Sequence, residues 1–126
     1  MGIEHTAIYV NDLESQKDFF VRYFDGRANE KYVNTGRGVT AYMISFPDGS
    51  RLELMNKAGI EEICPQRYLG FVHIAFSVGD EQKVTELTWR LHDDGYDIAS
   101  EPRVNGGGYF ESSILDKEGN LIELTI

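Results

Sequence analysis

The order of hydrophobic and polar residues predicts a strand followed by a helix at the start of the chain. Residues 3–10 alternate with a period of two, which is typical of a strand with one buried face. The period then lengthens to that of a helix, which Asn11 or Asp12 can cap and which continues to about Phe24. Residues 71–78 alternate in the same way, so the pattern predicts another strand there.

The rest of the chain predicts a second helix and several further strands. The helix is expected over 81–94, and Gly95 is suited to end it because glycine readily adopts the left-handed conformation. The strands are expected near 29–33, 39–46, 51–56, 96–99, 109–115 and 120–126. Each helix has an apolar face directed toward a core, formed by Leu13, Phe20 and Phe24 in the first and by Val84, Leu87 and Leu91 in the second.

The chain also contains an internal repeat. The segments IEHTAIYV and FVHIAFSV both place a histidine third, an alanine two residues later and a valine three residues after that. The ends of the two halves repeat as well, because Gly49 and Gly119 are each followed four residues later by a glutamate in a strand pattern. A repeat of this length that occurs twice indicates duplication within a domain rather than a solenoid.

The repeat predicts an α+β fold in which a βαβββ module occurs twice, forming two curved mixed sheets with a helix on the outer face of each. The modules cover about 1–57 and 70–126, and the segment 57–69 between them has mixed polarity and no clear period. Together they are expected to make one domain over 1–126, since the chain has the length of a single domain.

Four residues of the repeat are candidates for chemistry. The separation is 68 residues from His5 to His73 and 70 residues from Glu53 to Glu123. Strand alternation places all four opposite the strongly apolar face of their strands. Two imidazoles and two carboxylates suit a divalent cation, either zinc or an octahedral first-row metal whose shell is completed by water. A lone histidine or glutamate on a strand is more often structural or solvated, so the prediction depends on the repeated register.

Composition and charge limit the classes of partner that we expect for this chain. The chain has 12 Lys plus Arg against 21 Asp plus Glu, a formal net charge of −9, so most of its surface repels phosphate and nucleic acid is not expected as a partner. No apolar run is long enough to span a membrane, so we expect no membrane-spanning segment and no membrane partner. The only cysteine, Cys64, cannot form an internal disulfide, and the first residues do not resemble a signal peptide; both favour the cytoplasm.

The repeated motifs resemble those of the glyoxalase I/vicinal oxygen chelate superfamily, in the segments IEHTAIYV-NDL, GSRLEL, FVHIAFSV and DKEGNLIEL. The resemblance covers essentially the whole chain and implies that His5, Glu53, His73 and Glu123 bind one metal. A His/Glu/His/Glu set is similar to that of bacterial glyoxalase I, which implies Ni²⁺ or Zn²⁺, with Co²⁺ or Mn²⁺ as further options. It also implies a homodimer with sites shared between chains.

The activity that the resemblance implies is that of an isomerase or lyase acting on a small carbonyl compound or its thiol adduct. Charge on an enediolate would be stabilised by the metal, and Glu123 or Glu53 would transfer the proton; the symmetry of the repeat leaves the choice open. Two alternatives remain. One is an acyl-CoA epimerase, in which the second ligand is commonly glutamine. The other is a metal-free protein that sequesters a small molecule, as bleomycin-resistance members do.

This sequence departs from glutathione-dependent glyoxalase I at three positions. An arginine that binds the glutathione carboxylate in that family is replaced by Tyr9. The asparagine expected shortly after the second ligand has only Asn56 or Lys57 as a counterpart, and the basic residue before the paired glycines is Asn105. Recognition of glutathione is therefore not expected.

Overall fold

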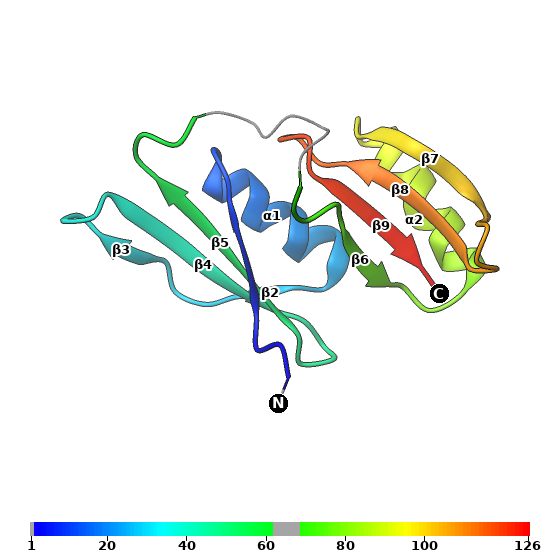
Figure 1. Ribbon diagram of the computed structural model, residues 1–126, viewed down its shortest axis with the longest axis horizontal. Coiled ribbons are helices and arrows are strands. Elements are labelled where there is room, and N and C mark those ends of the chain that lie inside the picture. The colour runs from blue at the N-terminus through cyan, green and yellow to red at the C-terminus, as the bar shows by residue number, and fades with distance from the viewer. Residues whose placement is uncertain (1, 62–68) are drawn as a thin grey trace. The chain divides into compact units, whose positions relative to one another are not determined.

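A computed structural model describes residues 2–61 and 69–126 of the chain (Figure 1). The chain divides into two compact units, Met1–Glu62 and Ile63–Ile126, and the described residues of each form one sheet and one helix. The predicted α+β class is confirmed, and the βαβββ plan recurs in both units, with two short strands in place of one predicted strand in the first unit. That the two units act as one functional domain stays a prediction. Cys64 and most of the predicted boundary segment lie outside the described residues.

The first unit is a five-stranded sheet with one helix. Its elements are β1 (Thr6–Tyr9), α1 (Leu13–Phe24), β2 (Arg27–Ala28), β3 (Tyr32–Asn34), β4 (Val39–Ser45) and β5 (Arg51–Lys57). The strand order is β1-β5-β4-β2, and β3 also pairs with β4. The strands β1 and β5 are parallel, whereas β4 is antiparallel to β5. The helix α1 packs on β4 and β5, so it covers one face of the sheet (Figure 1).

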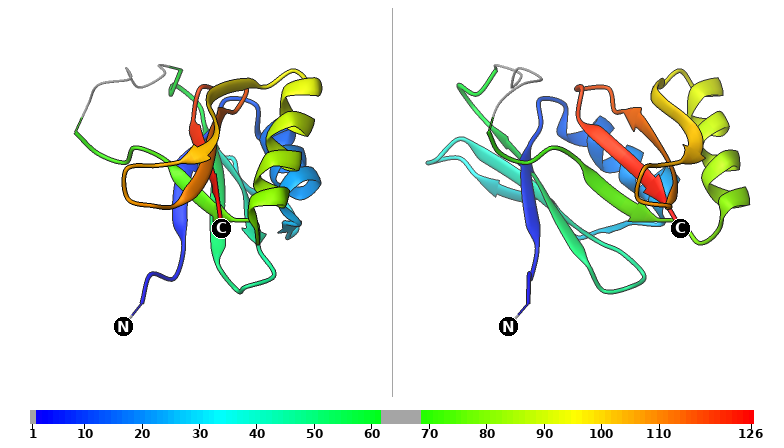
Figure 2. Two further views of the ribbon diagram at one scale, coloured as in Figure 1. Left: turned by 90° about the vertical axis from the view of Figure 1, so that its right-hand side faces the viewer. Right: turned by 45° about the vertical axis from the view of Figure 1, so that its right-hand side comes forward.

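The second unit repeats this plan with four strands. Its elements are β6 (Ile74–Ser77), α2 (Glu81–Asp93), β7 (Asp97–Val104), β8 (Phe110–Leu115) and β9 (Leu121–Thr125). The strand order is β6-β9-β8-β7, with β6 parallel to β9 and the other neighbours antiparallel. The helix α2 packs along β7, β8 and β9, as the views in Figure 2 show. In both units the first strand therefore pairs in parallel with the last.

Local signals explain where the helices begin and end. The side chain of Asp12 accepts a hydrogen bond from the backbone N–H of Ser15 at 3.0 Å, which confirms Asp12 as the cap of α1. Asp80 caps α2 in the same way, through the backbone N–H of Lys83 at 2.8 Å. Gly95 has a φ of 88° and follows the end of α2, which confirms the predicted glycine stop.

Each core lies between the helix and one face of the sheet. The predicted helix residues Leu13, Phe20 and Phe24 are buried, as are Val84 and Leu91. They pack with apolar side chains of one parity on the strands, chiefly Ile44, Leu52, Leu54, Ile114, Ile122 and Leu124. Leu87 is only half-buried and Thr88 takes the buried place, because its hydroxyl is satisfied by Ser112 Oγ at 2.6 Å and by a backbone carbonyl of α2.

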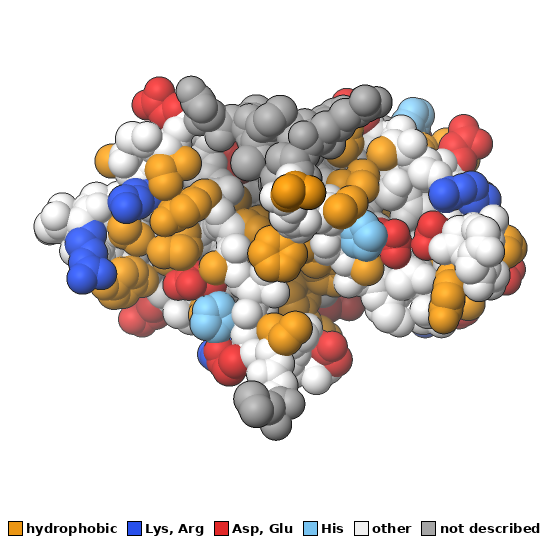
Figure 3. Space-filling view, in the orientation of Figure 1, with side chains coloured by type: hydrophobic (Ala, Val, Ile, Leu, Met, Phe, Trp, Pro, Cys, Tyr) orange, Lys and Arg blue, Asp and Glu red, His pale blue; other side chains and the backbone are white. Residues whose placement is uncertain are grey.

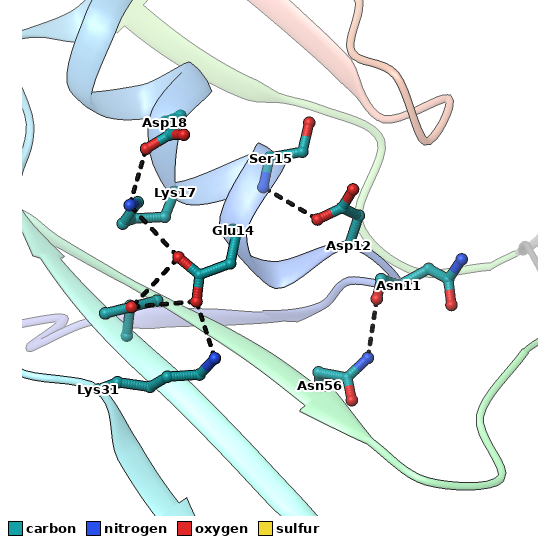
Figure 4. A network of polar contacts seen from close by, with 9 residues as sticks. Asn11, Asp12, Glu14, Ser15, Lys17, Asp18, Lys31 and Asn56 are labelled. Carbon is teal, nitrogen blue, oxygen red and sulfur yellow. Dashed lines mark hydrogen bonds and ion pairs between the residues drawn. The ribbon is translucent and has the colours of Figure 1, made fainter.

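A network of charged side chains attaches α1 to the sheet (Figure 4). Glu14 accepts hydrogen bonds from Lys31 Nζ at 2.8 Å and from the Tyr42 hydroxyl at 3.1 Å. The hydrogen bond from Lys31 lowers the pKa of the Glu14 carboxyl, and the same bond raises the pKa of Lys31. Lys17 pairs with Asp18 and also with Glu14. The network lies on the helix-covered side of the sheet and has a structural role.

Two predicted strands begin later than expected. The first strand starts at Thr6 and its counterpart at Ile74, rather than at residues 3 and 71. The pairing with β5 and β9 begins only there, since Thr6 pairs with Leu52 and Ile74 with Ile122. Residues 3–5 and 71–73 therefore precede the paired part of each sheet.

Two further predictions of strand limits were wrong. The strand expected near 29–33 is replaced by β2 and β3, both of which pair with β4, because Asn29 between them accepts a hydrogen bond from Met43 N at 2.8 Å. The strand expected at 96–99 continues to Val104 as β7, with two register shifts. Pro102 is tolerated there because β7 is an edge strand. Within the described residues no helix is both long and apolar enough to cross a membrane.

Candidate functional site

In the first unit, strand register brings His5 to Glu53. Ala7 of β1 is the parallel partner of Glu53 on β5, and His5 lies two residues before Ala7. The side chain of His5 reaches the same face as that of Glu53, and its Nε2 is 3.7 Å from Glu53 Oε2. This face is opposite the one on which Leu52 and Leu54 are buried beneath α1. The predicted pairing of histidine and glutamate is therefore present in this unit.

The second unit builds the same arrangement from its own residues. Ala75 of β6 is the parallel partner of Glu123 on β9, and His73 lies two residues before Ala75. His73 Nε2 is 3.6 Å from Glu123 Oε2. The duplicated sequence thus gives two His–Glu pairs whose separations agree within 0.1 Å.

The separation within each pair suits two ligands of one ion better than a direct hydrogen bond. A good hydrogen bond from nitrogen to oxygen is about 2.7–3.2 Å long, so 3.7 and 3.6 Å exceed it. Two donors that each lie about 2.1 Å from a metal are about 3.0 Å apart at a right angle and about 3.4 Å apart at the tetrahedral angle. Small side-chain rotations would bring either pair to that spacing, so the residues fit a divalent metal.

The four side chains lie on partly exposed faces. His5 and His73 are each 38% exposed, while Glu53 and Glu123 are 28% and 22% exposed. Met43 of β4 is opposite Glu53, and exposed apolar side chains lie on the same molecular surface as histidine and acidic groups in Figure 3. A carboxylate next to apolar groups loses part of its hydration, which a bound cation would offset.

The described residues of each unit contain one His–Glu pair, that is, two of the four predicted ligands. Among residues 2–61 and 69–126 no group of three or more His, Cys, Asp and Glu side chains is placed to hold a metal. The structure brings His5 to Glu53 and His73 to Glu123, and the union of the two pairs in one four-ligand site stays a prediction.

Sequence reasoning missed a charged pair beside the first histidine. The carboxylate of Glu4 contacts His5 Nδ1 through one oxygen and the guanidinium of Arg51 through the other. A strand beginning at residue 3 would have directed Glu4 away from His5. Because β1 begins at Thr6, Glu4 is free to turn toward the same face. The only feature of the sequence that indicated this contact was the position of Arg51 two residues before Glu53, which places both side chains on one face of the strand.

A second missed pair lies on the second unit. Glu111 of β8 is opposite Arg103 of β7, with Arg103 Nη2 3.7 Å from Glu111 Oε1. Glu111 is two residues from Ser113, the partner of Glu123, so both glutamates occupy the same face of the sheet. The prediction that β7 ended near residue 99 left Arg103 in a loop and hid this pair.

The positions that depart from glutathione-dependent enzymes have local roles. Asn56 Nδ2 donates to the carbonyls of Val10 and Asn11 at 3.0 and 2.9 Å, so its amide group is used to attach the end of β1 to β5. Asn105 Oδ1 accepts from the backbone N–H groups of Gly107 and Tyr109 and thereby closes the turn between β7 and β8. Neither side chain supplies positive charge to a ligand.

Solved structures with the same fold share little sequence with this chain. A glyoxylase/bleomycin resistance protein/dioxygenase domain from Frankia sp. EAN1pec has a TM-score of 0.86 at 16% identity, with 100% of this chain and 97% of that chain covered. Glyoxalase I from Zea mays has a TM-score of 0.79 at 23% identity; 97% of this chain is covered, but only 43% of the maize chain. At these identities the likeness concerns the fold.

The trypanothione-dependent glyoxalase I of Leishmania major is a further neighbour, with a TM-score of 0.79 at 23% identity and coverage of 99% of this chain and 86% of that one. Comparison with curated proteins finds no match. The sequence model of one family matches residues 2–124, nearly the whole chain. The chain therefore belongs to the Glyoxalase/Bleomycin resistance protein/Dioxygenase superfamily.

Proposed function

We propose that this protein is a metal-dependent isomerase or lyase of the glyoxalase type that acts on a small carbonyl compound or its thiol adduct. The observation that carries the proposal is the recurrence of one His–Glu pair, at 3.7 and 3.6 Å, in two units of different sequence. Membership of a superfamily that includes glyoxalase I supports it. Since many chemistries occur on one fold, the proposal depends on these side chains.

In this proposal His5, Glu53, His73 and Glu123 hold one divalent cation. Two neutral imidazoles and two carboxylates favour Ni²⁺ or Zn²⁺, with Co²⁺ or Mn²⁺ also compatible. A cation held there would stabilise the negative charge that develops on substrate oxygens when a proton is removed beside a carbonyl. The two carboxylates balance the charge of the ion in a site that is partly shielded from water.

The proton transfer is assigned to Glu53 or Glu123. A carboxylate that moves a short distance can accept a proton from one carbon and return it to the neighbouring carbon, so one residue serves as base and then as acid. Both glutamates are partly exposed and directed toward a histidine, so their positions alone do not distinguish them. Substrate would approach the open faces of the sheets, because α1 and α2 cover the other faces.

The direct test is metal content. Protein purified without chelators and incubated with Ni²⁺, Co²⁺, Mn²⁺ or Zn²⁺ is expected to retain about one ion per chain after desalting, measured by elemental analysis. His92 is exposed at the end of α2 and belongs to neither pair, so His92→Ala is the matched histidine control and is expected to keep the ion. Wild-type protein that retains no ion with any of the four metals would contradict the proposal and favour a metal-free binding protein.

We also expect poor turnover of the glutathione hemithioacetal of methylglyoxal. Tyr9 and Asn105 place no cation where the carboxylates of an anionic thiol carrier need one, and charge-assisted bonds contribute much of such binding. In a steady-state assay the metal-loaded protein should turn over more slowly than about 10 per second. Tyr9→Arg should raise kcat/KM, whereas fast turnover by the wild type would show that the chain recognises glutathione by another route.

A further inference from the structure

A carboxylate and a guanidinium extend the first His–Glu pair away from the metal position. Glu4 contacts His5 Nδ1 with one oxygen and Arg51 with the other, while His5 Nε2 is directed toward Glu53. Arg51 begins β5 and lies two residues before Glu53, so its side chain starts from the same face. Four charged or polar side chains therefore form a row in space, in which each lies next to the following one, in the order Arg51, Glu4, His5 and Glu53.

This order has a defined effect on the imidazole. A histidine binds a metal through an unprotonated ring nitrogen, and the hydrogen bond made by the other nitrogen decides which one is unprotonated. When Nδ1–H of His5 donates to Glu4, the lone pair of Nε2 is left on the side of Glu53. A carboxylate partner also fixes the ring orientation and raises the basicity of the ligand nitrogen. Arg51 holds the carboxylate by its second oxygen, which limits its motion.

Residues 69–126 of the second unit contain no such arrangement. The repeat aligns Glu4 with Val72 and Arg51 with Leu121, so both charged positions are apolar. Within the described residues no acidic side chain contacts Nδ1 of His73, and the atom that lies near Glu123 is Nε2. The two halves therefore have the same ligand types but different support for the histidine.

We propose that Glu4, held by Arg51, is a positioning residue that fixes the tautomer and orientation of His5 and makes the first pair the more strongly binding half of the site. This rests on the proposed function, since it assumes that His5 is a ligand. Loss of an outer partner typically weakens metal binding 10- to 100-fold. Glu4 is 62% exposed and therefore screened by water, so the lower end of that range, about tenfold, is expected for Glu4→Ala.

The affinity for Zn²⁺ can be measured by competition with a chromophoric chelator. Glu4→Gln keeps an acceptor but removes the charge, so its affinity should fall between those of wild type and Glu4→Ala. Asp18→Asn is the matched charge control, because Asp18 is an exposed, ion-paired carboxylate on α1, and it should bind as wild type does. Arg51→Met separates positioning from simple charge: removing a cation near the site would tighten binding, whereas loss of the anchor of Glu4 should weaken it, by about threefold.

A second readout needs no metal. In nitrogen-15 NMR spectra of the metal-free protein, at a pH where both imidazoles are neutral, His5 should carry its proton on Nδ1. Glu4→Ala should move His5 toward the Nε2–H tautomer and leave His73, the internal reference, unchanged. Thermal unfolding of each variant shows whether the fold is intact.

The outcomes separate this inference from the proposed function. If the wild type binds zinc and Glu4→Ala binds it equally well, the positioning role is overturned while the proposed function stands. If the wild type binds no metal, the proposed function fails, and an unchanged His5 tautomer in Glu4→Ala then overturns the positioning role as well. Tighter binding by Arg51→Met would overturn the part assigned to Arg51.

Discussion

Replacing Glu53 or Glu123 by glutamine is expected to weaken metal binding by about a hundredfold. Each substitution keeps the size of the side chain but removes a carboxylate charge from beside a cation. Breaking a buried charge pair by removing one partner costs about 3–5 kcal/mol. The glutamates are 28% and 22% exposed, so the cost should lie at the lower end of this range, about 3 kcal/mol. This free energy corresponds to a factor of about 100 in the dissociation constant of the metal. Isothermal titration with Zn²⁺ or Ni²⁺ measures it.

The matched control for this experiment is Glu111→Gln. Glu111 occupies the same face of the second sheet as Glu123, its side chain is only 14% exposed, and it pairs with Arg103 rather than with a histidine. Its substitution makes the same chemical change at nearly the same place, and should alter the affinity by less than about threefold. An equal loss of affinity in Glu111→Gln would mean that the general negative charge of the face attracts the ion, and ligation by Glu123 would be contradicted.

The fold could be predicted from the sequence because several independent signals agree. Alternation in the strands, apolar helix faces, Asp12 as a cap and Gly95 as a stop each specify the same βαβββ plan, and the repeat specifies it twice. The parity of the strands also predicted that His5 and Glu53 lie on one face, and the separation of 3.7 Å between their side chains agrees with this. These features depend on local periodicity, which a single sequence records.

Features that depend on pairing between distant segments could not be predicted in this way. The start of β1 at Thr6 follows from where β5 provides a partner, and the division into β2 and β3 follows from the hydrogen bond between Asn29 and β4. The contact of Glu4 with Arg51 depends on both the strand start and the register. Nothing in the order of residues 3–10 signals it, because Glu4 looks like one polar position of an alternating strand.

The largest effect on the complete site is expected from combining chains that each lack one histidine. We propose that the protein is a homodimer in which His5 and Glu53 of one chain meet His73 and Glu123 of the other. Within the described residues each unit contains only two of the four predicted ligands, and β1 and β6, which follow His5 and His73, are edge strands of their sheets. Unpaired edges favour coverage by another copy, and a two-fold contact covers both chains alike.

The length of the chain between the units permits either arrangement. The segment 57–69 has 13 residues and spans roughly 40 Å at most when extended. A site completed within one chain and a site completed between two chains are therefore both compatible with the connection. The experiment must distinguish them by the identity of the chain that carries each histidine.

In this experiment His5→Ala and His73→Ala chains are unfolded together and refolded as an equal mixture, and tightly bound Zn²⁺ is measured per chain. Neither variant alone should bind tightly. Random pairing makes half of the dimers heterodimers, and under the shared arrangement each heterodimer has one intact site of its two. The mixture should therefore bind about one quarter of the wild-type amount per chain.

A site within one chain predicts a different result, because every chain in the mixture then lacks a ligand and tight binding stays absent at all ratios. A mixture of His5→Ala with Glu53→Gln chains is the matched negative control, because both substitutions change the first unit. In a shared arrangement one site of each heterodimer then lacks His5 and the other lacks Glu53, so no intact site forms. Light scattering at the working concentration gives the oligomeric state and completes the test. A wild-type monomer that binds zinc fully would overturn the shared arrangement, whatever amount of zinc the mixture binds.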